Sequence, residues 1–425
     1  MRFCRIFWCL AFCAALVLPV PVAHARSHQA TVTLTFGLWD KNQMPAMQQI
    51  INGFEKQHPN VQVTIQQNPY ATYWNKLATL TAGGSGYDVF WMIGPSFPTY
   101  ASKGALLDLT PYMAADKVDL SRWPSSLISL YTWKSRHYAL VKDMDTIGLW
   151  YNKTLFDRAH VKYPDCSWTW QDYANAAKRL TVKQGGRTMQ YGTMIFNTLQ
   201  QIYGGIFGAY GGSVLNTART RSVIASPQNI QAANLLQGLI ADGSAMPGLS
   251  NATLTQDLAF ETGKIAMVLD GSWMVLPYTT MMGKGYTANV TCIPKGPKGR
   301  VSVIHGLGMV ADAHTKHPRE AWEFVRYLAG PTGAQVQAQT GAAIPDLIGS
   351  QRPWLVKHPN LDLQIFLNEV SGSVQYPAAL GYSEWYNMLQ TNFDQMLLGK
   401  KSPQATLTLT QQQMNSTLSK YYPTP

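Results

Sequence analysis

Tyr87-Asp-Val-Phe-Trp-Met-Ile93 is a nearly all-apolar run, which is typical of a strand buried on both faces of a parallel sheet. Two earlier segments, residues 31–36 and 61–65, carry apolar side chains at alternate positions and predict two more strands. Between them, residues 44–54 repeat apolar side chains at helical spacing. This alternation of strand and helix predicts an α/β fold with a mainly parallel sheet.

The same alternation returns along the rest of the chain. We predict further strands over residues 146–151, 264–269 and 301–310, helices over residues 170–180, 227–241 and 319–328, and a mostly helical last quarter from residue 361. A chain of 425 residues suggests two or three domains. Because no linker-like or repeated segment separates them, we expect two domains between which the chain crosses more than once.

The N-terminal segment has the pattern of a secretory signal peptide. Arg2 and Arg5 precede an apolar run over residues 6–18, and Ala23-His24-Ala25 is a small-x-small cleavage site. We therefore predict a signal peptide over residues 1–25. The alternative, a membrane anchor, is disfavoured because the apolar run is short and is followed by prolines. A lipobox is also missing, so we expect a periplasmic product instead of a lipoprotein.

The net charge does not indicate a nucleic-acid partner. The chain has 34 Lys+Arg against 23 Asp+Glu, a net charge of +11, which becomes 11 − 2 = +9 without residues 1–25. The densest basic patch, residues 295–300, has the composition of an exposed turn, and other basic residues are scattered. The 46% of hydrophobic residues also excludes a disordered chain.

The chain lacks the sequence motifs of several common classes of catalytic site. The chain contains no GxxxxGK[ST], GxSxG or HExxH motif. Gly306-Leu-Gly308-Met-Val-Ala311 lies in a strand-like run, which favours close packing over a dinucleotide site. His314 and His317 lie in a predicted turn, so we expect no metal site, no cofactor and no catalytic residue. A secreted glycan-active enzyme, with two carboxylates across a cleft, stays the alternative from a different class.

Aromatic residues are abundant, with 13 Trp and 21 Tyr. Trp39, Trp91, Trp273 and Trp385 follow strands or turns and have polar neighbours. Ligands of α/β sheets bind beyond the carboxyl ends of strands, where an indole can lie against the apolar face of a sugar ring. The alternative for each tryptophan is a place in the core.

A series of short motifs resembles a known family. In chain order they are Phe54-Glu-Lys-Gln-His-Pro-Asn-Val61, Tyr87-Asp-Val-Phe-Trp91, Leu107-Asp-Leu-Thr-Pro111, Thr146-Ile-Gly-Leu-Trp-Tyr-Asn-Lys153, Trp168-Thr-Trp170, Phe260-Glu-Thr-Gly-Lys-Ile-Ala-Met267 with Gly271-Ser-Trp273, Pro294-Lys-Gly-Pro-Lys-Gly299 and Ala321-Trp-Glu-Phe-Val-Arg-Tyr-Leu328. The series is similar to the extracellular sugar-binding proteins of bacterial ABC importers, the group that includes maltodextrin-binding proteins. The resemblance covers nearly the whole chain after residue 30.

The resemblance implies a two-lobed periplasmic-binding-protein (Venus-flytrap) fold with interleaved lobes and a hinge that the chain crosses several times. Lobe one is expected over residues 31–144 plus 291–340, and lobe two over residues 146–288 plus 345–425. A monomeric protein would capture a carbohydrate between the lobes and deliver it to an ABC permease in the inner membrane. A glycerol-phosphate or another anionic or polyol solute is the alternative ligand, which Lys41 would favour.

The resemblance also implies a ligand site with members from both lobes. Asp145 matches a ligand-binding carboxylate at the first crossing, and a hinge-loop cap is its structural alternative. The implied members are Trp39, Asp40 and Trp91 from lobe one, Asp145 at the crossing, and Gln201, Tyr203, Trp273 and Trp385 from lobe two.

Two cysteines, Cys166 and Cys292, lie outside the predicted signal peptide. The expected lobe boundaries place Cys166 in lobe two and Cys292 at the border of lobe one. Because a bond between them would lock the hinge, we predict two free thiols.

Overall fold

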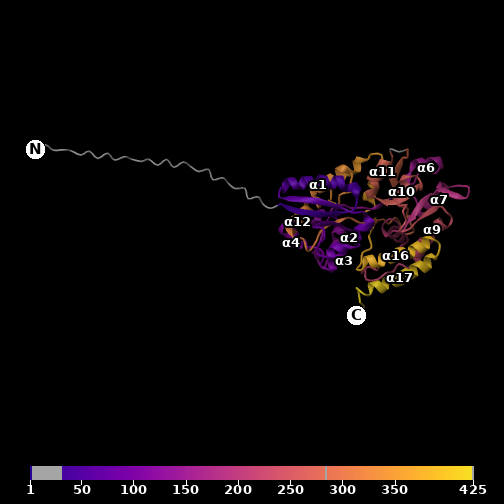
Figure 1. Ribbon diagram of the computed structural model, residues 1–425. Coiled ribbons are helices and arrows are strands. Elements are labelled where there is room, and N and C mark those ends of the chain that lie inside the picture. Colours follow the sequence, from indigo (N-terminus) through magenta and orange to yellow (C-terminus); the bar gives the residue numbers. More distant parts are fainter. Residues whose placement is uncertain (2–30, 283–284, 424–425) are drawn as a thin grey trace.

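The computed structural model describes Met1 and residues 31–282 and 285–423; the predicted signal peptide lies outside these residues. Helices gather into two halves (Figure 1), with α1, α2, α3, α4 and α12 in one and α6, α7, α9, α10, α11, α16 and α17 in the other. We refer to the first half as lobe one and to the second as lobe two.

Lobe one is built on a five-stranded sheet in the order β2-β1-β3-β15-β6. Its strands are β1 (Val32–Leu38), β2 (Val61–Gln67), β3 (Val89–Met92), β6 (Leu140–Val141) and β15 (Gly308–Ala311), and a small hairpin joins β4 (Thr132–Trp133) to β5 (Arg136–His137). The first three strands of the order are parallel, whereas β15 is antiparallel to both neighbours. All four residues of β3 are buried, as the all-apolar run predicts.

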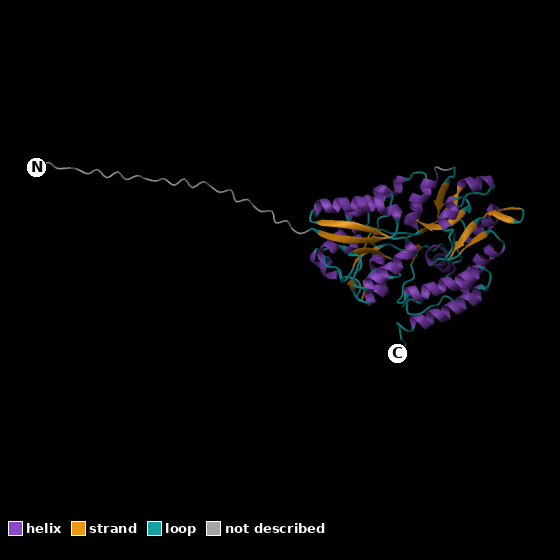
Figure 2. Cartoon of the chain, viewed as in Figure 1, coloured by secondary structure: helices purple, strands orange, loops and turns teal. Residues whose placement is uncertain are grey.

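Helices lie above and below this sheet (Figure 2). They are α1 (Met44–Gln57), α2 (Tyr70–Ala82), α3 (Phe97–Ser102), α4 (Thr110–Ala115), α5 (Ser125–Leu130), α12 (Pro318–Ala329) and α13 (Pro331–Thr340), with short helices η1 (Lys41–Gln43) and η2 (Leu120–Arg122) and with α14 (Arg352–Lys357) packed against α13. The apolar face of α1 is fully buried at Met47, Ile50 and Phe54, because residues three and four apart share one side of a helix.

Lobe two contains smaller sheets. Its three-stranded sheet, β12-β7-β13, is antiparallel, and β10 pairs in parallel with β11. Its strands are β7 (Ile147–Asn152), β8 (Val182–Gln184), β9 (Arg187–Gln190), β10 (Thr193–Phe196), β11 (Ala245–Gly248), β12 (Met267–Gly271), β13 (Ala288–Thr291), β14 (Val303–Ile304) and β16 (Val374–Gln375). The expectation of a mainly parallel sheet therefore holds for lobe one and not for the three-stranded sheet of lobe two.

Within the described residues, lobe two has eleven helices and short helical turns, and its last two, α16 and α17, are the longest in the final quarter of the chain. They are α6 (Lys153–Arg158), α7 (Trp170–Leu180), η3 (Leu199–Tyr203), α8 (Gly204–Tyr210), α9 (Pro227–Ala241), α10 (Gln256–Glu261), η4 (Ser272–Met274), α11 (Val275–Met281), α15 (Gln364–Asn368), α16 (Tyr382–Leu397) and α17 (Pro403–Leu418). α7 begins with a capping box in which Thr169 and Asp172 exchange backbone and side-chain hydrogen bonds. The sequence-based bounds of α7 and α9 agree with the structure.

Three segments of chain lie side by side between the lobes. Asp145 and His305 exchange backbone hydrogen bonds of 2.8 and 3.1 Å, and Met144 pairs with Ile344. The predicted strand over residues 301–310 is therefore interrupted: β14 belongs to lobe two, His305 lies at the crossing, and β15 belongs to lobe one. Close packing explains the glycine beside His305, because a Cβ on Gly306 would lie 2.3 Å from the carbonyl oxygen of Asp143.

A disulfide joins Cys166 and Cys292, so the prediction of two free thiols is wrong. Their Cα atoms lie 5.0 Å apart although 126 residues separate them in sequence. Cys292 directly follows β13, which pairs with β7, and the loop of Cys166 leads into α7. The bond therefore ties the loop before α7 to the end of β13 in lobe two.

Candidate functional site

Asp145 lies at the first crossing and has 9% of its surface exposed. One carboxylate oxygen accepts a hydrogen bond of 2.7 Å from the side-chain amide of Gln200, and the other lies 3.3 Å from Nδ1 of His305. Burial raises the pKa of Asp145, and the neighbouring His305 opposes this effect. The carboxylate is therefore held between residues of two different segments and keeps a small accessible surface.

An aromatic group from lobe one surrounds Trp39, which follows β1. Its indole packs edge-to-face on Tyr70, Tyr73 and Trp91, with ring centroids 5.5, 5.0 and 5.0 Å away, and more obliquely on Trp74 at 5.7 Å. We call these five residues the lobe-one aromatic group. Trp39 and Trp74 are half-buried and Tyr70 is 50% exposed, so this group presents ring surface at its outer edge.

Trp91 forms the inner part of this group and has no exposed surface. The ammonium group of Lys142 lies 4.6 Å from the centre of its ring, within range of a cation–π interaction. The same ammonium donates to Gln43 at 3.0 Å and to Gln337 at 3.2 Å, and it pairs with the carboxylate of Asp143. Lys142 is itself fully buried, so its charge is balanced inside the protein.

Asp40, the predicted neighbour of Trp39 in the site, acts as a helix cap. Its carboxylate accepts hydrogen bonds from the backbone N–H of Asn42 at 2.9 Å and from the side-chain amide of Gln43 at 3.1 Å. Such a bond at the start of η1 satisfies a backbone donor that the helix leaves unpaired.

A second aromatic group comes from lobe two. Tyr382 and Tyr386, one turn apart on α16, stack with centroids 5.0 Å apart and an angle of 13° between the rings. The hydroxyl groups of Tyr376 and Tyr382 lie 3.2 Å apart, and Trp385 packs edge-to-face on Tyr382 at 5.0 Å. We call Tyr376, Tyr382, Trp385 and Tyr386 the lobe-two aromatic group.

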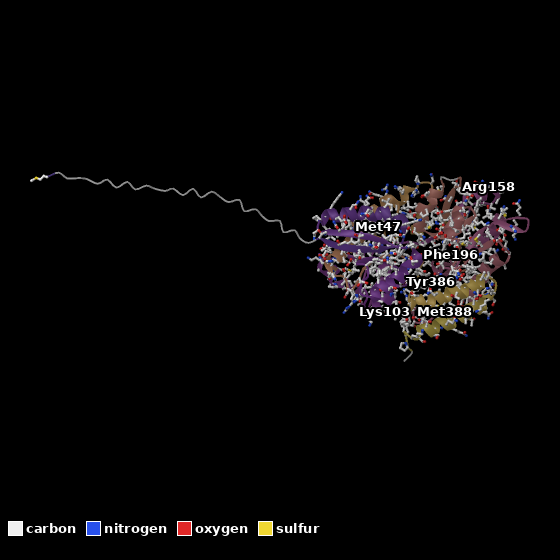
Figure 3. The ribbon with its side chains drawn as sticks, viewed as in Figure 1. Met47, Lys103, Arg158, Phe196, Tyr386 and Met388 are labelled. Carbon is white, nitrogen blue, oxygen red and sulfur yellow. A yellow bond between two sulfur atoms is a disulfide. The ribbon has the colours of Figure 1, made fainter. Side chains whose placement is uncertain are left out.

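The two aromatic groups approach each other across the boundary between the lobes. Burial raises the pKa of Tyr70 even though half of its surface is exposed, and the neighbouring phenol of Tyr386 adds to the rise. In Figure 3, Tyr386 lies near the middle of the molecule, between the half that holds Met47 and the half that holds Arg158.

A polar bridge joins the lobes close to this point. The side-chain amide of Gln375 donates to the carbonyl oxygen of Ser126, at 2.8 Å, and to the hydroxyl of Ser129, at 3.2 Å. Arg219 of lobe two donates to the carbonyl oxygen of the same amide. Lobe two therefore contacts α5 of lobe one in the arrangement that the structure shows.

The other predicted site residues lie in lobe two. Trp273 is half-buried, Tyr203 and Trp385 have no exposed surface, and the side chain of Gln201 accepts a 2.7 Å hydrogen bond from the hydroxyl of Thr198. The ring of Tyr203 packs against Phe393, with centroids 4.3 Å apart. Contact of these four residues with a ligand stays a prediction.

Sequence reasoning missed residues next to those that it selected. Gln200, and not Gln201, reaches Asp145, and Tyr386 keeps exposed surface whereas Trp385 has none. One residue along a helix turns the side chain by about 100°, because there are 3.6 residues per turn. The segment over residues 199–203 is moreover a π-helix, a form that is often found at functional sites and that shifts the register of side chains.

Two cavities of the described residues are lined by no member of the two aromatic groups. A cavity of about 10 Å³ lies beside Gln200, Gln201 and Ser302, which is barely the space for one water molecule. A hollow of about 370 Å³ lies on lobe one between Asp119 and Pro331, and no predicted site residue lines it. Among the residues that the structure describes, no cluster of three His, Cys, Asp or Glu side chains could hold a metal ion.

Comparisons with known proteins identify the class. Residues 39–335 match the family model of bacterial extracellular solute-binding proteins, and the chain therefore belongs to this family. None of the helices in the described part of the chain is long and apolar enough to span a membrane.

Individual relatives share little sequence identity with this chain, but they align with most of its length. A protein of Brucella abortus that is named a binding protein is 24% identical over 88% of this chain and 90% of its own. The multiple sugar-binding protein of Streptococcus mutans is 23% identical over 72% of each chain. An ABC substrate-binding protein of Listeria monocytogenes, solved with cycloalternan, superposes with a TM-score of 0.85 at 24% identity, covering 92% of this chain and 99% of that chain. The predicted two-lobed fold is thereby confirmed.

Proposed function

We propose that this chain is the carbohydrate-binding component of an ABC importer, that it works in the periplasm, and that it delivers its ligand to a permease in the inner membrane. One observation carries the proposal: Tyr376 of the lobe-two aromatic group packs edge-to-face on His305, with centroids 5.6 Å apart, and the same ring lies 3.3 Å from the partly exposed carboxylate of Asp145. Aromatic faces suit the apolar faces of sugar rings, and a carboxylate accepts hydrogen bonds from sugar hydroxyls.

The proposed ligand-facing residues are Trp39, Tyr70, Trp74, Asp145 and Tyr386. Trp91, Tyr203 and Trp385 would support them from behind, because these three side chains have no exposed surface. Trp273, Asp40 and Gln201 stay as predicted members at the edge of the site. The lobes would close on the ligand, and the free energy of ligand contact with both lobes would stabilise the closed form.

The contacts of the basic residues favour a neutral ligand over an anionic one. Lys142, next to Trp91, is buried and paired with Asp143, so it has no charge to offer a phosphate. Lys41, which would favour an anion, is exposed on η1. We also propose that the second crossing lies at His305 instead of residue 291, since Lys295 pairs with Thr169 of lobe two.

A ligand screen tests the proposal. The protein without its signal peptide is titrated calorimetrically with maltose, mannotriose, D-tagatose, cycloalternan, glycerol 3-phosphate and glucose 6-phosphate. We expect saturable binding of at least one neutral sugar and no reaction product on chromatography after prolonged incubation. Binding of the phosphorylated compounds alone would reject the neutral-sugar proposal, and hydrolysis of an oligosaccharide would favour the enzyme alternative.

A further inference from the structure

A chain of side-chain hydrogen bonds runs from lobe one to lobe two through His305. The backbone N–H of Gly94, which follows β3, donates to Nε2 of His305 at 3.0 Å. Nδ1 of the same ring lies 3.3 Å from one oxygen of Asp145, and Gln200 donates to the other oxygen. Gly94 belongs to lobe one and Gln200 to the π-helix of lobe two, and Asp145 and His305 lie on two of the three segments between them.

The donors in this chain fix the protonation of the imidazole. A backbone N–H can only donate, so Nε2 of His305 must offer its lone pair to Gly94. The proton of the neutral ring then resides on Nδ1, which donates it to Asp145. The ring is 2% exposed and packs edge-to-face on Tyr376, with centroids 5.6 Å apart, so it has no room to turn over.

We propose that His305 is a positioning residue for Asp145, that Gly94 selects its Nδ1–H tautomer, and that lobe one thereby orients the carboxylate that faces the ligand. This proposal rests on the proposed function, since it assigns Asp145 to ligand contact. With one donor on each oxygen, the carboxylate cannot rotate, and each oxygen keeps a lone pair for a ligand hydroxyl.

The surroundings of Asp145 include other charges that a test must consider. Lys142 and Asp143 lie on the same crossing and pair with each other. The phenol of Tyr131, which donates to the carbonyl oxygens of Met92 and Gly306, lies on the lobe-one side. Since these groups are unchanged by a substitution at His305, two variants at that one position share the same background.

Two amide substitutions of His305 test the two hydrogen bonds of its imidazole ring separately. His305→Asn places an amide near the position of Nδ1 and can still donate to Asp145. His305→Gln places its amide near the position of Nε2, where it can accept from Gly94 but leaves Asp145 without this donor. Loss of a donor to a buried carboxylate raises its pKa. We expect the pKa of Asp145 to be higher in His305→Gln than in His305→Asn by about one pH unit.

The measurement follows the side-chain carboxyl carbon of Asp145 by 13C NMR from pH 3 to pH 9 in the ligand-free protein. Equal pKa values in the two variants, or the reverse order, would overturn the proposal. If the variants do not fold, long-range 1H–15N spectra of the wild-type protein decide: the Nδ1–H tautomer of His305 at pH 8 supports the proposal, and the Nε2–H tautomer overturns it. Both readouts are independent of the ligand, so they are unaffected if no sugar binds.

Discussion

The two lobes reach stability by different means. Lobe one has a continuous five-stranded sheet whose central strand β3 is buried throughout. Lobe two distributes its strands over separate small sheets and adds the Cys166–Cys292 disulfide. It also buries two carboxyl groups, Asp270 and Glu369, whose pKa values burial raises to about 7. Redox conditions therefore act on lobe two, whereas pH acts on both lobes, because burial also raises the pKa of Asp346 between α13 and α14.

The largest expected effect compares one buried tryptophan from each lobe. Trp385 in lobe two and Trp322 in lobe one are both fully buried. Replacing either by alanine leaves a large cavity and is expected to cost about 4 kcal/mol in the free energy of unfolding. In urea unfolding followed by circular dichroism, each variant should weaken the transition of its own lobe. A single transition that both variants shift equally would show that the lobes unfold as one unit.

Loss of the disulfide is expected to cost about 3 kcal/mol, because the bond restricts the unfolded chain. Urea unfolding of Cys166→Ser should resemble that of the reduced wild-type protein, and only the lobe-two transition should move. Ser416→Ala, an exposed serine-to-alanine change on α17 of the same lobe, does not alter any thiol and serves as a control for handling. Two thiol equivalents in the unfolded, unreduced wild-type protein would contradict the disulfide.

The pH dependence of stability provides a third comparison. The pKa of Asp270 is raised from 3.8 to about 7 because burial disfavours the charge. Between these values the folded protein retains a proton that the unfolded chain releases, so the contribution of Asp270 to stability is fully present below pH 4 and is lost as the pH rises to 7. The slope is at most about 1.4 kcal/mol per pH unit for one group.

Asp270→Asn should remove the contribution of Asp270 and leave that of Glu369, whose pKa is raised from 4.5 to about 7. The amide can still accept the 2.8 Å hydrogen bond that the backbone N–H of Gly271 donates to Asp270. Urea titrations at pH 4, 5, 6 and 7 measure the slope. An unchanged slope in Asp270→Asn would locate the pH dependence in groups other than Asp270.

The smallest effect on stability is expected at Tyr70, which is half exposed. Tyr70→Ala should change the free energy of unfolding by less than about 0.5 kcal/mol and weaken binding of the sugar found in the screen about tenfold. Met189, equally exposed on the β8–β9 hairpin, provides a matched control, and Met189→Ala should alter neither quantity. Unchanged sugar affinity in Tyr70→Ala would remove this residue from the proposed site.

Periodicity predicted most elements because each depends on a local pattern. The bounds of α7 and α9 follow from Thr169 and Ser226, which cap the two helices, and from the apolar spacing behind them. The break at His305 was missed because β14 and β15 are both apolar, and only the three-segment crossing between the lobes separates them. A continuous apolar run carries no signal for such a crossing.

A candidate site is harder to predict than a helix or strand, since a site depends on contacts between distant segments. Asp145 was selected, whereas its partner His305 comes 160 residues later and has no local motif. Tyr70 was missed because a half-exposed aromatic residue at the start of a helix resembles any surface residue. The prediction of free thiols was wrong for a related reason: no local pattern shows that Cys292, next to β13, lies beside the loop of Cys166.

The interleaved order of the lobe-one sheet sets a condition on how the chain folds during export. β15 lies between β3 and β6, yet Gly308 follows Met92 by 308 − 92 = 216 residues. When residues 32–141 emerge, β3 and β6 therefore have no strand between them. The sheet can be completed only after residues up to 311, almost three quarters of the chain, have been translocated. Contacts of such high sequence separation slow folding. We expect deletion of residues 308–311 to abolish the native state of lobe one, because β15 alone joins β3 to β6 in the sheet.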